Sequence, residues 1–115
     1  MFCINIEKET IKNKLYRKVI YTDKNQQIVL MSLNMGEYIP METHKVTQFF
    51  RIESGKGYAE IDNKKIILKD GFSLSVPPDT NHKIVNTSKL PLKLYTIYSP
   101  PVHGADEQDK RQSEF

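Results

Sequence analysis

The sequence predicts an all-β fold, an antiparallel barrel or jelly roll. Short runs rich in Val, Ile, Phe and Tyr recur about every eight to twelve residues, and Gly, Pro, Asn and Asp separate them. No apolar period of 3.6 residues continues for three helical turns. Because many short antiparallel strands must hide their edges, a closed barrel or jelly roll is typical of a chain of 115 residues.

The expected elements follow this punctuation from the N-terminus onward. The segment Asn5–Lys14 is expected to form one short helix or turn. A hairpin turn is expected at Asp62 and Asn63, which tolerate the left-handed conformation, and Pro77 and Pro78 must leave the ladder because proline lacks an N–H. Strands are expected at Leu15–Tyr21, Gln27–Leu33, Gln48–Glu53, Gly57–Ile61, Lys65–Leu68, Phe72–Val76, His82–Asn86 and Leu92–Tyr98.

The length allows one domain, which we expect at residues 1–99. From Pro100 onward the composition changes, and residues 104–114 have almost no side chain to bury. Residues 100–115 are therefore expected to form a flexible C-terminal tail.

Composition and charge favour a soluble, cytoplasmic protein. The longest apolar run, Ile28–Met31, is far too short to span a bilayer, and Met1–Glu7 lacks the pattern of a secretory signal. The single cysteine, Cys3, excludes an internal disulfide and is typical of a reducing compartment. The net charge of +3 comes from scattered lysines without interleaved aromatic residues, so no nucleic acid partner is expected.

Two segments, residues 36–55 and 71–86, carry the residues with chemical potential. In an extended chain, side chains two residues apart point the same way, so Glu42 and His44 share a face, and Gln48 has the same parity. Donors that converge inside a barrel are costly to bury alone, and a divalent cation would satisfy them together. Alternating polar residues on an exposed strand would look the same, and His82 alone is no stronger a signal.

Read together, the two segments resemble the paired motifs of the cupin superfamily. The first motif is a glycine, His-x-His, a glutamate and a second glycine, and Gly36, Glu42, His44, Gln48 and Gly55 fall at its spacings. The resemblance implies a double-stranded β-helix, or jelly-roll barrel, that holds one metal ion at its mouth.

The second motif is a glycine, Pro-x-Gly, a histidine and an asparagine, and Gly71, Pro77, His82 and Asn86 match it position for position. The motif glycine after the proline is replaced by Asp79, which tolerates a left-handed turn nearly as well.

The resemblance therefore implies four metal ligands, which are Glu42, His44, Gln48 and His82. Glu42 replaces a histidine and Gln48 replaces the glutamate, so the set keeps one carboxylate and otherwise neutral donors. Oxygen-rich ligands with imidazole suit Zn, Mn, Fe, Ni or Co, and we expect looser binding because glutamine is an uncharged ligand.

A narrower resemblance, to small single-domain cupins called mannose-6-phosphate isomerase-like, covers Tyr16–Thr22, Gln48–Gly57 and Pro91–Pro101. It implies a sugar or sugar-like small-molecule substrate and isomerase-type Lewis-acid chemistry. A sensor cupin without turnover, a metal-dependent oxygenase and a metal-free mouth with hydrogen-bonded polar residues remain alternatives. The histidine- and threonine-bearing tail of that group is not recognisable beyond His103.

Other residues are assigned from strand parity and position. Phe50 shares the parity of Gln48 and is expected in the pocket wall, whereas Tyr98 is expected in the core. His103, at the start of the tail, is expected to be a solvated histidine. No general base is identified in the matched segments. Because small cupins often pair through their edge strands, we expect a homodimer.

Overall fold

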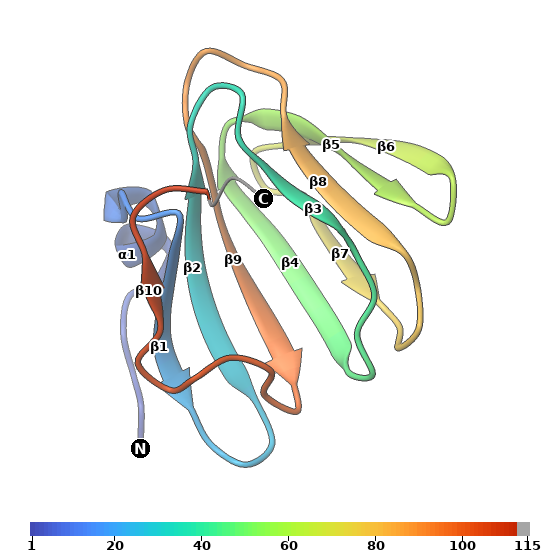
Figure 1. The fold of residues 1–115 in the computed structure, drawn as a ribbon. Coiled ribbons are helices and arrows are strands. Elements are labelled where there is room, and N and C mark those ends of the chain that lie inside the picture. The colour runs from blue at the N-terminus through green and yellow to red at the C-terminus, as the bar shows by residue number, and fades with distance from the viewer. Residues whose placement is uncertain (113–115) are drawn as a thin grey trace.

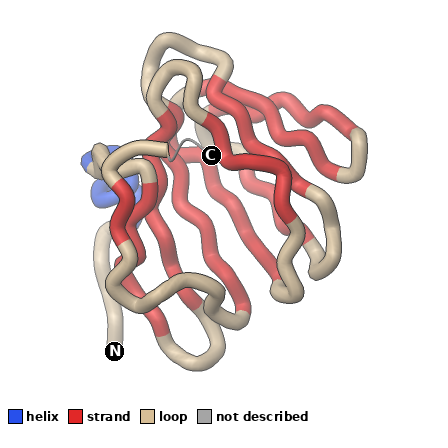
Figure 2. Tube along the Cα trace, viewed as in Figure 1, coloured by secondary structure: helices blue, strands red, loops and turns tan. Residues whose placement is uncertain are grey.

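The computed structural model describes residues 1–112 and consists almost entirely of strands and turns (Figures 1 and 2). Its elements are α1 (Ile6–Lys12), β1 (Arg17–Thr22), β2 (Gln27–Leu33), β3 (Tyr38–Glu42), β4 (Thr47–Ser54), β5 (Lys56–Ile61), β6 (Lys64–Lys69), β7 (Ser73–Val76), β8 (His82–Asn86), β9 (Leu92–Ser99) and β10 (Gln108–Asp109). Every expected strand is present, with ends that differ by a few residues. The expected helix is also present, and the side chain of Asn5 caps it by accepting a hydrogen bond from the Lys8 N–H at 3.1 Å.

Two antiparallel sheets face each other, as Figure 1 shows. The first has the order β10-β1-β2-β9-β4-β7, and the second has the order β3-β8-β5-β6. Strands distant in sequence are neighbours in both sheets, which is the pattern of a jelly roll. The predicted all-β jelly-roll fold is confirmed.

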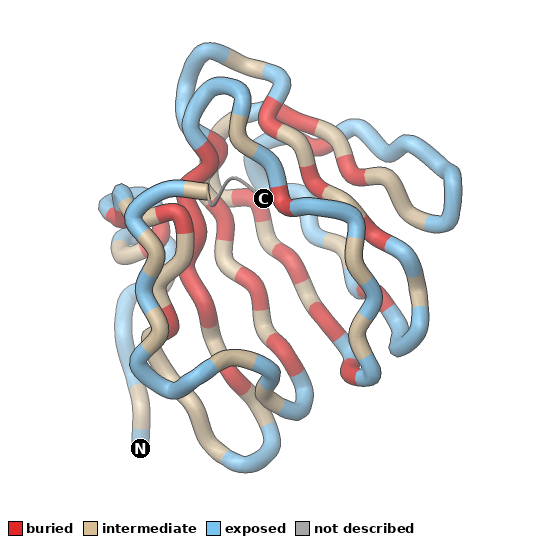
Figure 3. The backbone as a smooth tube through the Cα atoms, in the orientation of Figure 1, coloured by how far each residue is buried: buried red, intermediate tan, exposed pale blue. Residues whose placement is uncertain are grey.

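The core lies between the two sheets. Along β9, Leu92, Leu94, Thr96 and Tyr98 are buried, while the residues between them are only partly buried or exposed. Figure 3 shows the same alternation along β4. This period of two places one face of each strand against the opposite sheet. A few polar residues, among them Gln48, His82 and Thr96, are buried as well.

Strand β3, at the edge of the second sheet, was not predicted from the sequence. Pro40 interrupts its alternation, and the pairing with β8 is irregular between Ile39 and Glu42. Proline cannot donate a ladder hydrogen bond, so it is tolerated at an edge or a bulge. Beyond the bulge, Glu42 pairs with His82 across the two strands.

The tight turns agree with the expectations from sequence. Asp62 and Asn63 have φ values of 46° and 68°, so both adopt the left-handed conformation that the β5–β6 hairpin requires. Asp79 has a φ of 63° where the motif carries glycine. Its backbone N–H donates to the carbonyl of His44 at 2.8 Å, which joins the two motif segments directly.

The described part of the expected flexible tail, residues 100–112, is instead packed against the first sheet. Strand β10 pairs with β1, the Tyr16 N–H donates to the Lys110 carbonyl at 3.1 Å, and Arg17 Nη1 lies 2.6 Å from Asp109 Oδ2. The prediction of a flexible tail rested on the scarcity of apolar side chains in this segment. The observed contacts are backbone hydrogen bonds and ion pairs, which do not depend on apolar side chains. Residues 113–115 of the expected tail lie outside the described residues. Within residues 1–112, no helix has the length and apolar character needed to cross a bilayer.

We predict that Gly57→Ala destabilises the fold. A Cβ at Gly57 would lie 2.2 Å from the carbonyl oxygen of Val85 on the neighbouring strand, so the strand backbones would have to separate. Overpacking of this kind typically costs about 1–3 kcal/mol, and a clash with backbone lies at the upper end. Urea unfolding of both Gly57→Ala and Gly104→Ala tests this prediction. Gly104→Ala is the matched control, because nothing lies within 4 Å of a Cβ added at Gly104. Equal unfolding midpoints for the two variants would contradict the close strand approach.

Candidate metal centre

The predicted ligands come from three strands and one connection that meet at one end of the barrel. Glu42 is the last residue of β3, His82 is the first residue of β8, and Gln48 is the second residue of β4. His44 lies in the short connection between β3 and β4. Figure 1 shows the end of β3 and the starts of β4 and β8 at this same end.

Glu42, His44 and His82 form a cluster with the spacing of a metal site. One ligand atom from each lies within 4.8 Å of the others. His44 Nε2 is 3.1 Å from Glu42 Oε1, and His82 Nε2 is 3.8 Å from the same oxygen. The His82 side chain is 1% exposed, whereas Glu42 and His44 are 34% and 21% exposed. The cluster is therefore closed on the side of His82 and open to solvent on the other.

The hydrogen bonds of His82 determine which of its nitrogens faces the cluster. Nδ1 lies 3.0 Å from the carbonyl oxygen of Thr80, which can only accept, so Nδ1 carries the proton. In the neutral ring, Nε2 is then an acceptor, and it has no hydrogen-bond partner among the described residues. A backbone carbonyl that orients the second nitrogen in this way is typical of histidines that bind metal.

Gln48 is oriented in an equivalent way. Its side-chain Nε2 donates to Thr96 Oγ1 at 3.0 Å, and its Oε1 is buried without a hydrogen-bond partner among residues 1–112. Phe50, two residues further along β4, faces the same interior, and its ring centroid is 5.9 Å from that of His82. Gln48 and Phe50 are thus buried on the side of β4 that faces His82.

The donor set fits a divalent cation. A buried acceptor without a donor costs about 1–3 kcal/mol, and Gln48 Oε1 and His82 Nε2 are both such acceptors. A cation satisfies both atoms, and Glu42 and His44 bring a carboxylate and a second imidazole beside them. Two imidazoles, one carboxylate and one amide oxygen are ligands that first-row transition metals accept.

Tyr98 lies in the core as expected, and together with His103 it belongs to this end of the barrel. The Tyr98 ring centroid is 5.5 Å from His44 and 5.1 Å from His103, and both contacts are edge-to-face. His103 was expected to be solvated, but its Nε2 is 3.2 Å from Tyr98 Oη and its Nδ1 is 2.9 Å from Glu107 Oε2. No local pattern could reveal this, because the return of residues 100–107 past β9 creates the contact.

These contacts define a directed hydrogen-bond chain. A carboxylate only accepts, so Nδ1–H of neutral His103 donates to Glu107, and Nε2 accepts from the Tyr98 hydroxyl. Burial, and then the negative charge of Glu42, raise the pKa of Tyr98, so its phenol stays protonated. Burial, and then the positive charge of Arg17, lower the pKa of His103. The chain therefore runs from the Tyr98 hydroxyl through a neutral His103 imidazole to the Glu107 carboxylate.

Comparison with known proteins gives consistent results. Residues 29–98 match the family described as a cupin domain. The uncharacterized protein YrkC of Bacillus subtilis is 41% identical over 109 residues, which cover 89% of this chain and only 59% of YrkC. An uncharacterized mimivirus protein is 42% identical over 117 residues, and the match covers 73% of the length of that protein. A crystal structure from Bacillus halodurans superimposes with a TM-score of 0.92 at 36% identity, covering 96% of this chain and 89% of that one.

We predict that Thr96→Val destabilises the protein through Gln48. The nearly isosteric change removes the acceptor of the Gln48 Nε2 hydrogen bond inside the barrel, and an unpaired buried donor costs about 1–3 kcal/mol. The matched control is Thr10→Val, because Thr10 is also fully buried but its hydroxyl has no partner among the described residues. Urea unfolding in the presence of chelator should show a loss for Thr96→Val and no loss for Thr10→Val. A similar effect at both positions would show that the Gln48–Thr96 bond contributes little.

Proposed function

The chain belongs to the cupin domain family, and we propose that it binds one divalent transition-metal ion through Glu42, His44, Gln48 and His82. Zn, Mn, Fe, Ni and Co are the candidate ions. The observation that carries this proposal is the pair of buried, unpartnered acceptors on Gln48 and His82, next to the clustered Glu42 and His44. In a metal-free mouth these atoms would be expected to hydrogen-bond one another or water, and residues 1–112 supply neither of them with a partner.

The charge of the donor set supports the same proposal. One carboxylate and three neutral donors leave a divalent ion with a net charge of about +1, as in the usual cupin set of three histidines and one glutamate. The exchange of residues at positions 42 and 48 therefore moves the carboxylate without removing it. Four protein ligands would leave room for a water or for an oxygen of a small molecule.

We further propose that the ligand of this site is a small polar molecule, such as a sugar or a related hydroxy acid. A bound divalent ion would polarise a carbonyl group and acidify the neighbouring C–H. Phe50 would form an apolar wall beside His82, and the more exposed Glu42 and His44 would face the solvent side from which the ligand enters.

Isomerase-type chemistry also needs a group that accepts and returns a proton, and His103 is our candidate. Its Nε2 accepts the Tyr98 hydroxyl proton while Glu107 holds Nδ1–H, so a proton lost by a ligand at Tyr98 Oη can pass to His103. The lowered pKa of His103 favours the neutral, accepting form near neutral pH. This assigns the base that the motif segments lack.

The assignments to the mannose-6-phosphate isomerase-like group and to a homodimer stay predictions. A sensor without turnover would keep the metal and the ligand but show no reaction, and an oxygenase would consume O₂ with a redox-active ion. Size-exclusion chromatography at micromolar concentration tests the dimer, and a monomer mass would count against it.

We predict that protein purified without chelator contains about one divalent ion per chain and that His82→Ala abolishes it. Loss of a fixed, inward-facing imidazole removes one of four donors, and His82 is the most deeply buried histidine of the cluster. His103→Gln is the matched control, because it replaces a histidine outside the donor set and should keep the metal. Elemental analysis of the three proteins, with circular dichroism to check folding, makes the comparison. Absent metal in the wild type after reconstitution, or retention in His82→Ala, would contradict the site.

We predict that His103→Gln loses proton transfer while it keeps ligand binding. The measurement is deuterium exchange of the proton on the carbon next to the carbonyl group, which is C2 in an aldose and C1 in a 2-ketose. Proton NMR follows the exchange in aldoses, ketoses and uronates, and metal content is measured in parallel. General acid–base groups typically contribute about 10²–10⁴-fold, so the exchange rate should fall by that order. Saturable ligand binding without exchange in the wild type would instead indicate a sensor, and O₂ uptake would indicate an oxygenase.

A further inference from the structure

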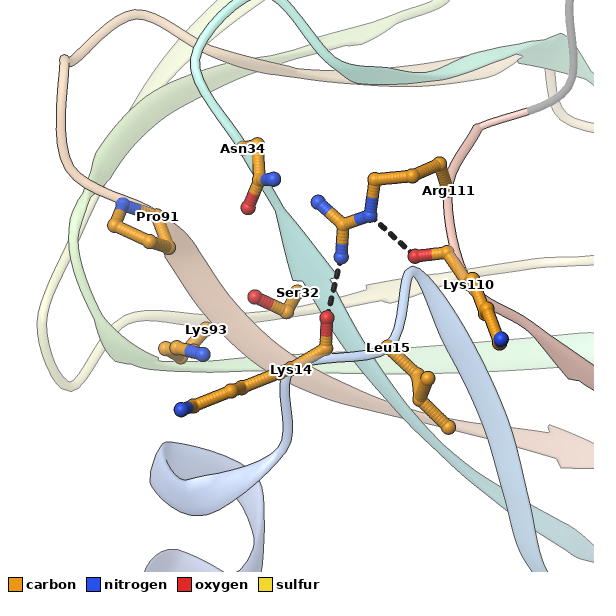
Figure 4. Close-up of a pocket in the computed structure, with 8 residues that line it drawn as sticks. All are labelled: Lys14, Leu15, Ser32, Asn34, Pro91, Lys93, Lys110 and Arg111. Carbon is orange, nitrogen blue, oxygen red and sulfur yellow. Dashed lines mark hydrogen bonds between the residues drawn. The ribbon is translucent and has the colours of Figure 1, made fainter.

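A second pocket lies at the opposite end of β2 and β9 from the metal centre. Ser32 and Lys93 are partners across these strands near one end, and Gln27 and Tyr98 are partners near the other. Ser32 and Lys93 alternate with core residues, so they face the outside of the first sheet. The pocket has a volume of about 470 Å³ and is lined by Lys14, Leu15, Ser32, Asn34, Pro91, Lys93, Lys110 and Arg111 (Figure 4).

Half of the lining residues carry a positive charge, and none carries a negative one. Arg111 is compensated, because its Nη1 lies 3.1 Å from Glu37 Oε1. Lys14, Lys93 and Lys110 have no carboxylate within 4.0 Å in residues 1–112. The pocket therefore concentrates positive charge that the described part of the protein does not neutralise.

Arg111 has a structural role here and is not free to bind a ligand. Its Nε and Nη2 donate to the backbone carbonyls of Lys110 and Lys14 (Figure 4). Its Nη1 contacts Glu37, so all three side-chain nitrogens are occupied. These contacts tie the C-terminal segment to the connection between α1 and β1, and they form one wall of the pocket. The lysines are left as the groups that can attract a ligand.

Lys14 and Lys93 are the lysines that act together. Figure 4 shows their ammonium groups on the same side of the pocket, and the Lys93 ammonium also donates to the carbonyl of Asn13. Partial burial, and then the positive charges of Lys14 and Arg111, lower the pKa of Lys93. The protein thus holds like charges close together in a partly buried place, where an anion would relieve their repulsion.

We propose that this pocket binds a small organic phosphate. Lys14 and Lys93 would contact the phosphate group as point charges, and Ser32 and Asn34 would add neutral polar groups. Leu15 and Pro91 offer apolar surface to the organic part of the molecule. The site is independent of the metal centre, because the two lie at opposite ends of the same strand pair.

The test is a titration of the full chain with inorganic phosphate and then with phenyl phosphate, at constant ionic strength, followed through backbone amide NMR shifts. Saturable shifts are expected at Leu15, Ser32 and Lys93, with tighter binding of phenyl phosphate because of the apolar wall. Lys14→Gln should weaken phosphate binding about fivefold and Lys14→Glu about 25-fold, for the loss of one and two units of charge. Absence of saturable shifts with either probe would overturn the proposal.

The matched control is Lys24→Glu, an exposed lysine in the turn between β1 and β2, near the far end of β2. It changes the net charge as Lys14→Glu does and should leave phosphate binding unchanged. If Lys14→Glu and Lys24→Glu weaken phosphate binding equally, the effect comes from net charge alone, and the proposed site is wrong. Lys93→Gln is a second variant within the pocket. His82→Ala should bind phosphate normally, and this result separates the test of the pocket from the test of the metal centre.

Discussion

Two buried acceptors, Gln48 Oε1 and His82 Nε2, face the interior of this barrel without a hydrogen-bond partner in the described part of the chain, and the rest of the site is arranged around them. Each is held in place by a hydrogen bond on the opposite side of the same group, to Thr96 Oγ1 and to the Thr80 carbonyl. The direction of each acceptor is therefore decided before any ligand arrives. Preorganisation of this kind lowers the reorganisation that binding requires and favours a specific ion over a loose surface contact.

Most of the fold could be predicted from the sequence because it depends on local patterns of residues. Alternation of buried and exposed residues determines the inward face of β4 and β9, and Asp62, Asn63 and Asp79 each adopt the left-handed turn that their residue type allows. Strand β3 was missed because Pro40 interrupts the alternation of side chains by which a strand is recognised. Only the pairing with β8 shows that this segment is a strand. Strand β10 was missed because two residues carry no periodic signal.

The candidate site could be predicted only in part, because some of its contacts join residues that are distant along the chain. Motif spacing selects Glu42, His44, Gln48 and His82, and the structure brings Glu42, His44 and His82 within 4.8 Å of one another while Gln48 is buried on the adjoining wall. The sequence places Tyr98 correctly in the core, but it does not reveal that His103 contacts the Tyr98 ring. Their contact depends on the path of residues 100–107 along the first sheet. The side-chain amide of Gln27, distant in sequence, and backbone hydrogen bonds such as that from the Val19 N–H to the Glu107 carbonyl hold this path.

The C-terminal segment connects the two ends of the molecule physically. Near its start, the His103 N–H donates to Gln27 Oε1 and its imidazole meets Tyr98, beside the metal centre. Near its end, Arg111 closes the lysine-lined pocket through the Lys14 carbonyl. Between them, Arg17 binds Asp109, and β10 pairs with β1. Because Arg17 and Arg111 hold the segment partly through ion pairs with Asp109 and Glu37, salt weakens these contacts, whereas the backbone hydrogen bonds between β10 and β1 do not depend on charge.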